Sequence, residues 1–374
     1  MSIKFVKRIS GALLGLIAIS FLECAVPEPN ESFARLAAFE NNTQPKNIIL
    51  MIGDGMGLSQ VSAALYANNN RLHLERFPVI GFHKSYSASD LVTDSAAGAT
   101  AFACGKKTYN GAVGMKKDST PCQSILEEAE QRGMATGLVA TSTIVHATPA
   151  AFIAHQPLRT MYEDIALDFL DTEIDFFVGG GQRYFERRRQ DDRNLMKEMQ
   201  RRGYDMRSYF GDNMNSKTID YTKNFAYFTA DTDPLPVSQG RDYLPYVSRL
   251  APNFLQKHNN DEGFFLMIEG SQIDWMGHAN ESNLLLAEML DFDRAIENVL
   301  EFAEDNGDTL VIVTADPDTG GLALNPKSKM KNPRLAFTTN GHTATLIPVY
   351  AYGPGAAQFR GIYENTEIYH KMQA

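Results

Sequence analysis

The sequence predicts an α/β fold in which helices cover both faces of a central, mostly parallel sheet. Short runs of Ile, Leu, Val and Phe recur from Asn47 onward, and such nearly continuous apolar runs are typical of strands buried on both faces. Longer amphipathic segments separate these runs. Strand and helix therefore alternate over 46–374, as expected for a single α/β domain with a three-layer arrangement.

The apolar runs place the strands in order along the chain. We expect strands at NIILMI (47–52), TGLVATS (136–142), DFFVGG (175–180), FFLMIE (264–269), TLVIVTA (309–315) and LIPVYAY (346–352). Helical spacing of apolar residues is clearest over 124–133, where Gly133 suits a helix end, and over 282–307. The charged stretch 186–223 is less periodic, and its run Arg187–Arg189 is typical of a solvated helix face.

Composition limits the class of protein. Of the 374 residues, 44 % are hydrophobic and 21 % are charged, which is ordinary for a globular chain and excludes a disordered or fibrous one. The formal net charge of −10 argues against nucleic acid as a partner, because phosphate neutralisation needs a basic face. Three cysteines are too few for a disulfide scaffold.

Residues 1–23 have the pattern of a signal peptide. Basic residues precede an uncharged apolar run over 9–22, which is short for a membrane span and suits a secretory signal better than a buried helix. Cys24 follows as in a lipoprotein signal, although Glu23 stands where such signals carry a small residue, so lipid anchoring stays open. We expect a flexible arm over 24–45 and an exported protein, periplasmic or associated with the outer membrane.

The two remaining cysteines have two interpretations. Cys104 and Cys122 lie 18 residues apart, and an oxidising compartment would let them form a disulfide. Cys104 also lies in the apolar stretch ATAFACG, where a free cysteine is simply a small buried side chain. Both interpretations stay open, because spacing does not define disulfide geometry.

Polar clusters lie near several predicted strand ends, where ligands collect in open α/β sheets. They are IGDGMG (52–57), TDSAAGATA (93–101), EGSQIDWMGH (269–278), TAD (314–316) and GHTA (341–344). Each cluster alone has a plain structural explanation, such as a turn, a helix cap or a satisfied core histidine. Their occurrence together in one domain indicates a functional site.

The residue types in these clusters suit anion and metal chemistry. Small residues after Ser95 favour a helix that starts near the serine, and a helix N-terminus attracts anions such as phosphate. The plain alternative is that Asp94 or Ser95 only caps this helix. Glu269 is expected at a strand end, with Asp274 and His278 in the following loop, and this mixture of carboxylates and imidazole suits Zn²⁺ and Mg²⁺.

Taken together, the motifs IGDGMG, TDSAAGATA, ATPAAFIAH, EGSQIDWMGHA and GHTATLIPVYAYGPGA resemble those of the alkaline phosphatases, from about Lys46 to the C-terminus. The resemblance is greatest to the smaller bacterial members, including cold-adapted ones. It implies an alkaline phosphatase-like fold, hydrolysis of small phosphate monoesters over a broad substrate range, two zinc ions, one magnesium ion and a homodimer.

The resemblance also implies roles for single residues. Ser95 matches the nucleophile that forms a covalent phosphoserine, and Arg159 matches the guanidinium that binds phosphate. The ligands of the first zinc, whose bound water would attack the phosphoserine, match Asp274, His278 and His342.

The other two metal sites share one residue. Asp54, Asp316 and the Ser95 oxygen match ligands of the second zinc, which would hold the serine as an alkoxide. Asp54 would also bridge to the magnesium, whose site Thr148 and Glu269 complete.

One position departs from the family pattern at a metal ligand. After the strand-end Asp316 the family carries a histidine that binds the second zinc, and this chain has Pro317. An all-oxygen site is harder and binds zinc less tightly, so we expect a weakened second site. Asp318 is a conceivable replacement donor on a turn that Pro317 stiffens.

His146 and Trp275 occupy positions that vary within the family, near the magnesium site and the phosphate, and Trp275 is equally explained by packing. Two other functions stay open, a related phosphodiesterase or sulfatase on the same fold and a catalytically impaired phosphate-binding homologue. Ser95 together with Arg159 favours a phosphomonoesterase.

Overall fold

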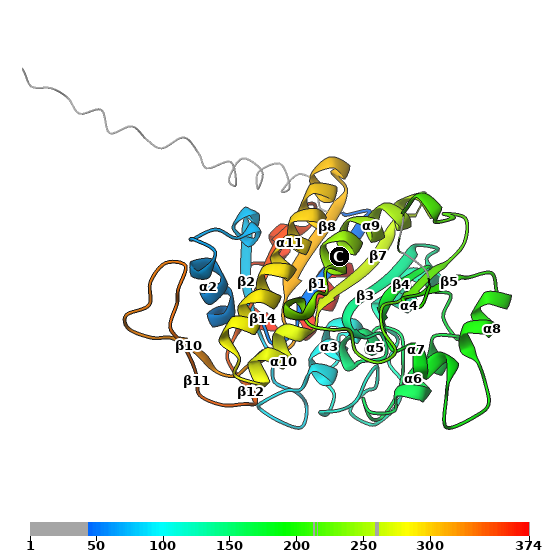
Figure 1. Cartoon of the computed structure of the whole chain (residues 1–374), viewed down its shortest axis with the longest axis horizontal. Coiled ribbons are helices and arrows are strands. Elements are labelled where there is room, and N and C mark those ends of the chain that lie inside the picture. The colour runs from blue at the N-terminus through cyan, green and yellow to red at the C-terminus, as the bar shows by residue number, and fades with distance from the viewer. Residues whose placement is uncertain (1–43, 212–213, 215, 259–261, 374) are drawn as a thin grey trace, which may run out of the picture.

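The computed structural model describes residues 44–211, 214, 216–258 and 262–373 (Figure 1). The predicted signal peptide over 1–23, Cys24 and nearly all of the predicted arm lie outside the described residues. Within the described ranges, no helix combines the length and apolar character needed to cross a bilayer.

A ten-stranded sheet forms the centre of the molecule (Figure 1). Nine strands run in one direction, and only β13 is antiparallel to its neighbours β2 and β8. From edge to edge the strands are β14 (Gly361–Glu364), β2 (Val79–Lys84), β13 (Ile347–Tyr352), β8 (Thr309–Thr314), β1 (Asn47–Gly53), β7 (Phe264–Gly270), β3 (Ala135–Thr143), β4 (Phe176–Gly180), β6 (Phe225–Phe228) and β5 (Asp205–Ser208).

Helices cover both faces of this sheet, so the predicted three-layer fold is confirmed. Along β1, Ile48, Leu50 and Ile52 face one apolar core, whereas Ile49 and Met51 face the other. The first core is covered by α3 (Ser95–Cys104), α4 (Ile125–Gln131), α5 (Ala147–Ala150), α6 (Tyr162–Asp168), α7 (Gln182–Glu186), α8 (Leu195–Arg201) and α12 (Thr366–Gln373). The second is covered by α2 (Leu58–Ala67), α9 (Tyr243–His258), α10 (Gln272–His278) and α11 (Ser282–Asn306).

Short elements complete the fold at the sheet edges and loops. Two small antiparallel ribbons pair β9 (Asp318–Thr319) with β12 (His342–Thr343) and β10 (Leu322–Leu324) with β11 (Leu335–Phe337). Single 3₁₀ turns are η1 (His73–Arg76), η2 (Ser216–Thr218), η3 (Val237–Gln239) and η4 (Ala356–Phe359).

All six predicted strands are present, with ends that differ by one residue or less from the prediction. The helices predicted over 124–133 and 282–307 are α4 and α11, and the helix predicted to start near Ser95 is α3. Ser124 and Glu127 form a capping box at the start of α4, and Gly133 follows its C-cap with a φ of +76°. Gly307 ends α11 in the left-handed conformation that glycine adopts readily.

The strands that the sequence did not indicate are short or exposed on one side. In β2, Val79, Gly81 and His83 are buried while Ile80 and Lys84 are exposed, so the segment lacks a continuous apolar run. The four-residue β5 lies inside the charged stretch 186–223. Pairing with β6 therefore determines this strand more than its own composition does.

The prediction that Arg187–Arg189 lies on a solvated helix face is wrong for the helix and for Arg188, whereas Arg187 and Arg189 are exposed as expected. Helix α7 ends at Glu186, so the run follows the helix. The Arg188 side chain is fully buried, where Nη2 lies 2.7 Å from Asp191 Oδ2 and Nη1 donates to the Glu163 carbonyl at 2.6 Å. A buried guanidinium is tolerated here because its donors are paired.

Cys104 and Cys122 form a disulfide, so the first of the two interpretations left open by the sequence is the observed one. Cys104 is the last residue of α3, and both cysteines are buried in the core on that face of the sheet.

Candidate active site

Three carboxylates meet at the C-terminal edge of the sheet, because three adjacent parallel strands end there in register. Ile52 of β1 pairs with Glu269 of β7 on one side and with Thr314 of β8 on the other. Asp54 and Asp316 come two residues after these paired positions. Asp54, Glu269 and Asp316 are all completely buried.

Burial makes this carboxylate group unfavourable without a cation. Burial and then repulsion from Asp316 raise the pKa of Asp54 well above its usual range. The same two causes raise the pKa of Glu269 to about 8. Burial raises the pKa of Asp316 to about 7. A low-dielectric site with three carboxyl groups fits bound divalent cations.

Unpartnered oxygens point to the same conclusion. Among the described residues, Asp54 Oδ2, both oxygens of Glu269 and Asp316 Oδ1 are buried without a hydrogen-bond partner. Buried polar atoms are normally satisfied, so these oxygens are available as metal ligands. The residues therefore fit the magnesium and zinc that the family resemblance implies.

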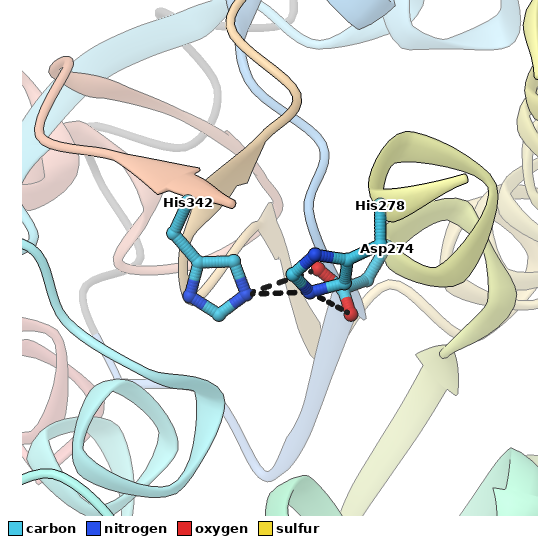
Figure 2. Close-up of side chains that lie close together, drawn as sticks. All are labelled: Asp274, His278 and His342. Carbon is cyan, nitrogen blue, oxygen red and sulfur yellow. Dashed lines mark hydrogen bonds and ion pairs between the residues drawn. The ribbon is translucent and has the colours of Figure 1, made fainter. Parts of the chain in front are cut away.

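A second group joins one carboxylate and two imidazoles (Figure 2). The Nε2 atoms of His278 and His342 lie 3.1 Å apart, and each lies 3.3 Å from an oxygen of Asp274. Asp274 and His278 are four residues apart on α10, so the expectation that they lie in a loop is wrong. Their i,i+4 spacing places both side chains on the same helix face.

Carbonyl groups orient the two imidazoles. His278 Nδ1 lies 2.6 Å from the Asn340 carbonyl, and His342 Nδ1 lies 2.8 Å from the Thr93 carbonyl. Since a carbonyl accepts, each Nδ1 carries the hydrogen, which in the neutral ring leaves the Nε2 lone pair facing Asp274. This arrangement is typical of histidines that bind zinc.

The hydrogen bonds also shift the titration of this group. Burial alone would raise the pKa of Asp274, but hydrogen bonds from the protonated rings of His278 and His342 outweigh it and lower that pKa. The hydrogen bond to Asp274 raises the pKa of His278 to about 9.

The β9–β12 ribbon positions His342 next to α10. His342 pairs with Thr319, whose hydroxyl donates to Asp274, and Thr343 pairs with Asp318. Asp318 accepts a hydrogen bond from Thr343 Oγ1 at 2.5 Å, which holds its carboxylate in the ribbon. Asp318 is thus fixed in the ribbon through its Oδ2 atom.

Two glycines let these segments pack together. A Cβ on Gly55, whose φ is +77°, would lie 2.7 Å from Asp274 Cα. A Cβ on Gly57 would lie 1.9 Å from Asp318 Oδ1. The IGDGMG motif thus serves close backbone approach as well as presenting Asp54.

His146 is a ligand candidate that the sequence placed only near the magnesium site. One ring nitrogen lies within 4.8 Å of carboxylate oxygens of both Asp54 and Glu269. Its Nδ1 is buried and unpartnered within the described part of the chain. Trp275 packs edge-on against this ring with centroids 5.9 Å apart, so a packing role for Trp275 is observed.

Thr148 completes the polar group on that side. Its hydroxyl donates to Asp316 Oδ2 at 3.1 Å. Thr148 therefore contacts a carboxylate that is predicted to bind the second zinc.

Ser95 is the first residue of α3 and faces the carboxylates. Its hydroxyl lies 3.4 Å from Asp54 Oδ1. Asp94 is the N-cap, as the plain interpretation expected, and its Oδ1 accepts from Ala97 N at 3.0 Å. Asp94 Oδ2 also accepts from Arg159 Nη1 at 3.1 Å, so the cap residue orients the guanidinium beside Ser95. A helix cap and an arginine separated by 65 residues gave no sequence signal for this contact.

The chain resembles known proteins over most of its length. The family described as "Alkaline phosphatase" matches residues 45–336 and 325–374. Alkaline phosphatase 3 of Bacillus subtilis is 33 % identical, over 98 % of this chain and 96 % of that protein. The alkaline phosphatase of the Antarctic bacterium TAB5 has a solved structure with a TM-score of 0.84, at 44 % identity over 88 % of this chain and 97 % of that one.

A variant of the TAB5 enzyme in which a histidine is replaced by glutamate was solved with Mg bound in its M3 site, at 42 % identity, a TM-score of 0.83 and the same coverage. These comparisons confirm the predicted fold and family. The chain belongs to the alkaline phosphatase family and is a phosphomonoesterase.

Proposed function

We propose that the chain hydrolyses small phosphate monoesters, over a broad range of leaving groups, through a covalent phosphoserine at Ser95. The observation that carries this proposal is the position of the Ser95 hydroxyl. It lies at the N-terminus of α3, 3.4 Å from Asp54 Oδ1, and the Arg159 guanidinium is anchored on the adjacent Asp94. A nucleophile, an anion-binding helix end and a bidentate phosphate binder thus converge on one point.

The residues divide the work of phosphoryl transfer. Ser95 Oγ attacks phosphorus as its proton passes to Asp54, the bond from phosphorus to the leaving oxygen breaks, and that oxygen takes a proton from water to leave as the alcohol. Water then attacks the phosphoserine and gives up a proton to solvent, the bond from phosphorus to Oγ breaks, phosphate is released, and Oγ takes its proton back from Asp54. The Arg159 guanidinium and the free N–H groups at the start of α3 bind the phosphoryl oxygens in both steps.

Two zinc ions and one magnesium ion complete the proposed site. Asp274, His278 and His342 would hold the first zinc. Asp54, Asp316 and Ser95 Oγ would hold the second, and Asp54, Glu269 and Thr148 the magnesium, with His146 as a further donor to this set. When bound, such ions lower the pKa of a coordinated hydroxyl or water and stabilise the entering and leaving oxygens.

The second zinc site is proposed to be weak. Pro317 is buried next to Asp316 and offers no side-chain donor. His146, an imidazole in the same region, is grouped with Asp54 and Glu269, and Asp318 is bonded to Thr343. The remaining ligands are oxygens, which bind zinc less tightly than imidazole does.

Replacing Arg159 tests its proposed role. We expect Arg159→Ala to raise the inhibition constant of inorganic phosphate by about tenfold or more and to raise KM, with a smaller effect on kcat, since a bidentate phosphate contact is lost. Steady-state kinetics with a chromogenic monoester measure all three. An unchanged phosphate inhibition constant would contradict the assignment.

An impaired phosphate-binding homologue is the alternative that Pro317 favours. A single-turnover experiment distinguishes it from the enzyme. The enzyme releases a burst of alcohol from a monoester, stoichiometric with sites, whereas a binding protein releases none. Parallel assays with a phosphodiester test the related diesterase function.

Export and assembly are further proposals. The Cys104–Cys122 disulfide supports an oxidising compartment, and the N-terminal sequence supports export to the periplasm or outer membrane. Cell fractionation tests the location, and incorporation of labelled palmitate tests a lipid anchor at Cys24. Sedimentation equilibrium tests the homodimer that the family resemblance implies.

A further inference from the structure

The disulfide joins the C-terminal end of α3, the helix that begins at Ser95, to the segment that is hydrogen-bonded to Arg159. We propose that Cys104–Cys122 is a positioning element for phosphate binding, which fixes Arg159 relative to Ser95 through residues 109–122, called here the strap. This inference rests on the proposed roles of Ser95 and Arg159. It assigns the disulfide a function in substrate affinity in addition to stability.

The segment that carries Arg159 is bonded to the strap through its backbone. Arg159 N donates to the Gly111 carbonyl at 2.7 Å. Gln156 and Val113 exchange two hydrogen bonds, each of 3.0 Å. Three backbone bonds thus connect the arginine segment to the strap, so the place of Arg159 depends on where the strap lies.

The strap also holds the residue that orients the guanidinium. Gly111 N donates to Asp94 Oδ2 at 3.0 Å, the same oxygen that accepts from Arg159 Nη1. Asn110 Oδ1 accepts from Asp94 N at 3.3 Å. A displaced strap would therefore disturb both the backbone and the side-chain anchors of Arg159.

The strap is joined to helix α3, which begins at Ser95. Thr100 of this helix contacts the strap at two points, donating to the Ala112 carbonyl at 3.3 Å and accepting from Gly114 N at 3.1 Å. Cys122 N donates to the Gly114 carbonyl at 2.9 Å, so the two ends of the 114–122 turn are held together. The disulfide adds a covalent cross-link between Cys122, at the far end of this turn, and the end of α3.

The disulfide thus helps to fix the position of Arg159 relative to Ser95. Ser95 and Cys104 are the two ends of one helix of ten residues, whereas Arg159 is tied to the strap. Without the disulfide, the strap is held to α3 and its cap only by hydrogen bonds and by the packing of Val113 in the shared core. A guanidinium that is displaced by about 1 Å loses much of its bidentate bonding, so phosphate affinity falls more than the rate of the chemical step.

The experiment removes the disulfide with and without Arg159. We expect Cys104→Ala/Cys122→Ala to raise the phosphate inhibition constant and KM by about fivefold, with kcat within about twofold of wild type. In the Arg159→Ala background the same pair of substitutions should leave the phosphate inhibition constant unchanged. Zinc content of each variant, measured by elemental analysis, shows that the metal sites are filled equally.

A control variant separates positioning from general destabilisation. Leu195→Ala removes a buried side chain of α8, outside the strap and the Arg159 segment, and should lower the melting temperature without changing phosphate affinity. If the cysteine variant fails to fold, the wild-type chain is purified with reduced thiols and compared before and after oxidation, and the inhibition constant should fall as the disulfide forms.

The outcomes are distinct. Equal phosphate inhibition in the oxidised protein and in the cysteine variant or reduced protein overturns the inference, as does an increase that persists in the Arg159→Ala background. If Arg159→Ala itself leaves phosphate inhibition unchanged, the proposed role of Arg159 fails, and this inference fails with it.

Discussion

Replacing Ser95 by alanine is expected to reduce the turnover of phosphate monoesters by about three orders of magnitude or more, because the proposed nucleophile is removed. Incubation with labelled phosphate at acid pH should then trap no phosphoenzyme. The measurements are steady-state kinetics and acid-quenched labelling followed by mass spectrometry of the peptide that contains residue 95.

The fold should survive this substitution. Ser95 is the first residue of α3, where the helix cap is supplied by Asp94 and not by the serine hydroxyl. Alanine is also a good helix former. We therefore expect a melting temperature close to that of wild type, so that lost turnover reports chemistry and not unfolding.

Ser95→Thr is the matched control, because it keeps a hydroxyl at the same position. It should retain more turnover than Ser95→Ala and still form a phosphoenzyme. A phosphoenzyme in Ser95→Ala would show that another residue is the nucleophile, and the proposed mechanism would be wrong.

The sequence predicts the fold correctly where a strand is buried on both faces, because burial then requires an apolar residue at nearly every position of the strand. Strands such as β1 and β8 are buried on both faces, so their runs are continuous and unmistakable. The short edge strands β5 and β14 were missed, because pairing with a neighbouring strand determines them more than their own residues do. The fold class followed because the central strands carry the strong signal.

The candidate site could be predicted in part, for a similar reason. Asp54, Glu269 and Asp316 could be predicted as site residues because each lies at or just after the end of a strand, and the parallel register brings them together. Contacts made across loops gave no such signal. The bond from Arg159 to Asp94 and the grouping of His146 with Asp54 depend on how α3, α5 and the loop after it pack, which no local pattern encodes.

The disulfide and the buried Arg188 show the same limit. Cysteine spacing left two interpretations of Cys104 open, and only the packing of Cys122 against the end of α3 decides between them. A run of three arginines resembles a solvated surface, yet Arg188 is buried because the Glu163 carbonyl and Asp191 lie in reach.

The second large effect is expected from Pro317→His. A neutral imidazole is a strong zinc ligand, whereas proline at this position has no side-chain donor. We expect wild type to titrate with one tightly held zinc at Asp274, His278 and His342 and one weak metal that chelators remove readily. The substitution should tighten the weak site and raise activity at limiting zinc by about tenfold or more, as for a lost metal ligand that is restored.

The amount of zinc bound by wild type and by Pro317→His tests the predicted tightening of the second site without relying on turnover. Zinc bound per chain is measured by elemental analysis after dialysis against graded chelator, in wild type and in Pro317→His. The tight site should be identical in the two proteins, because the substitution changes neither its three ligands nor the carbonyls of Asn340 and Thr93 that orient the two histidines. Only the weakly bound zinc should differ, and it should need a higher chelator concentration for its removal from Pro317→His than from wild type.

Pro317→Ala is the control, since it relaxes the turn before Asp318 without adding a donor. It should keep the weak second phase of wild type. If the histidine and alanine variants bind zinc and turn over substrate alike, the lost-ligand explanation is wrong, and another group holds that coordination position. His146 is then the first residue to test, because its ring already lies within reach of Asp54, the carboxylate that the second zinc and the magnesium would share.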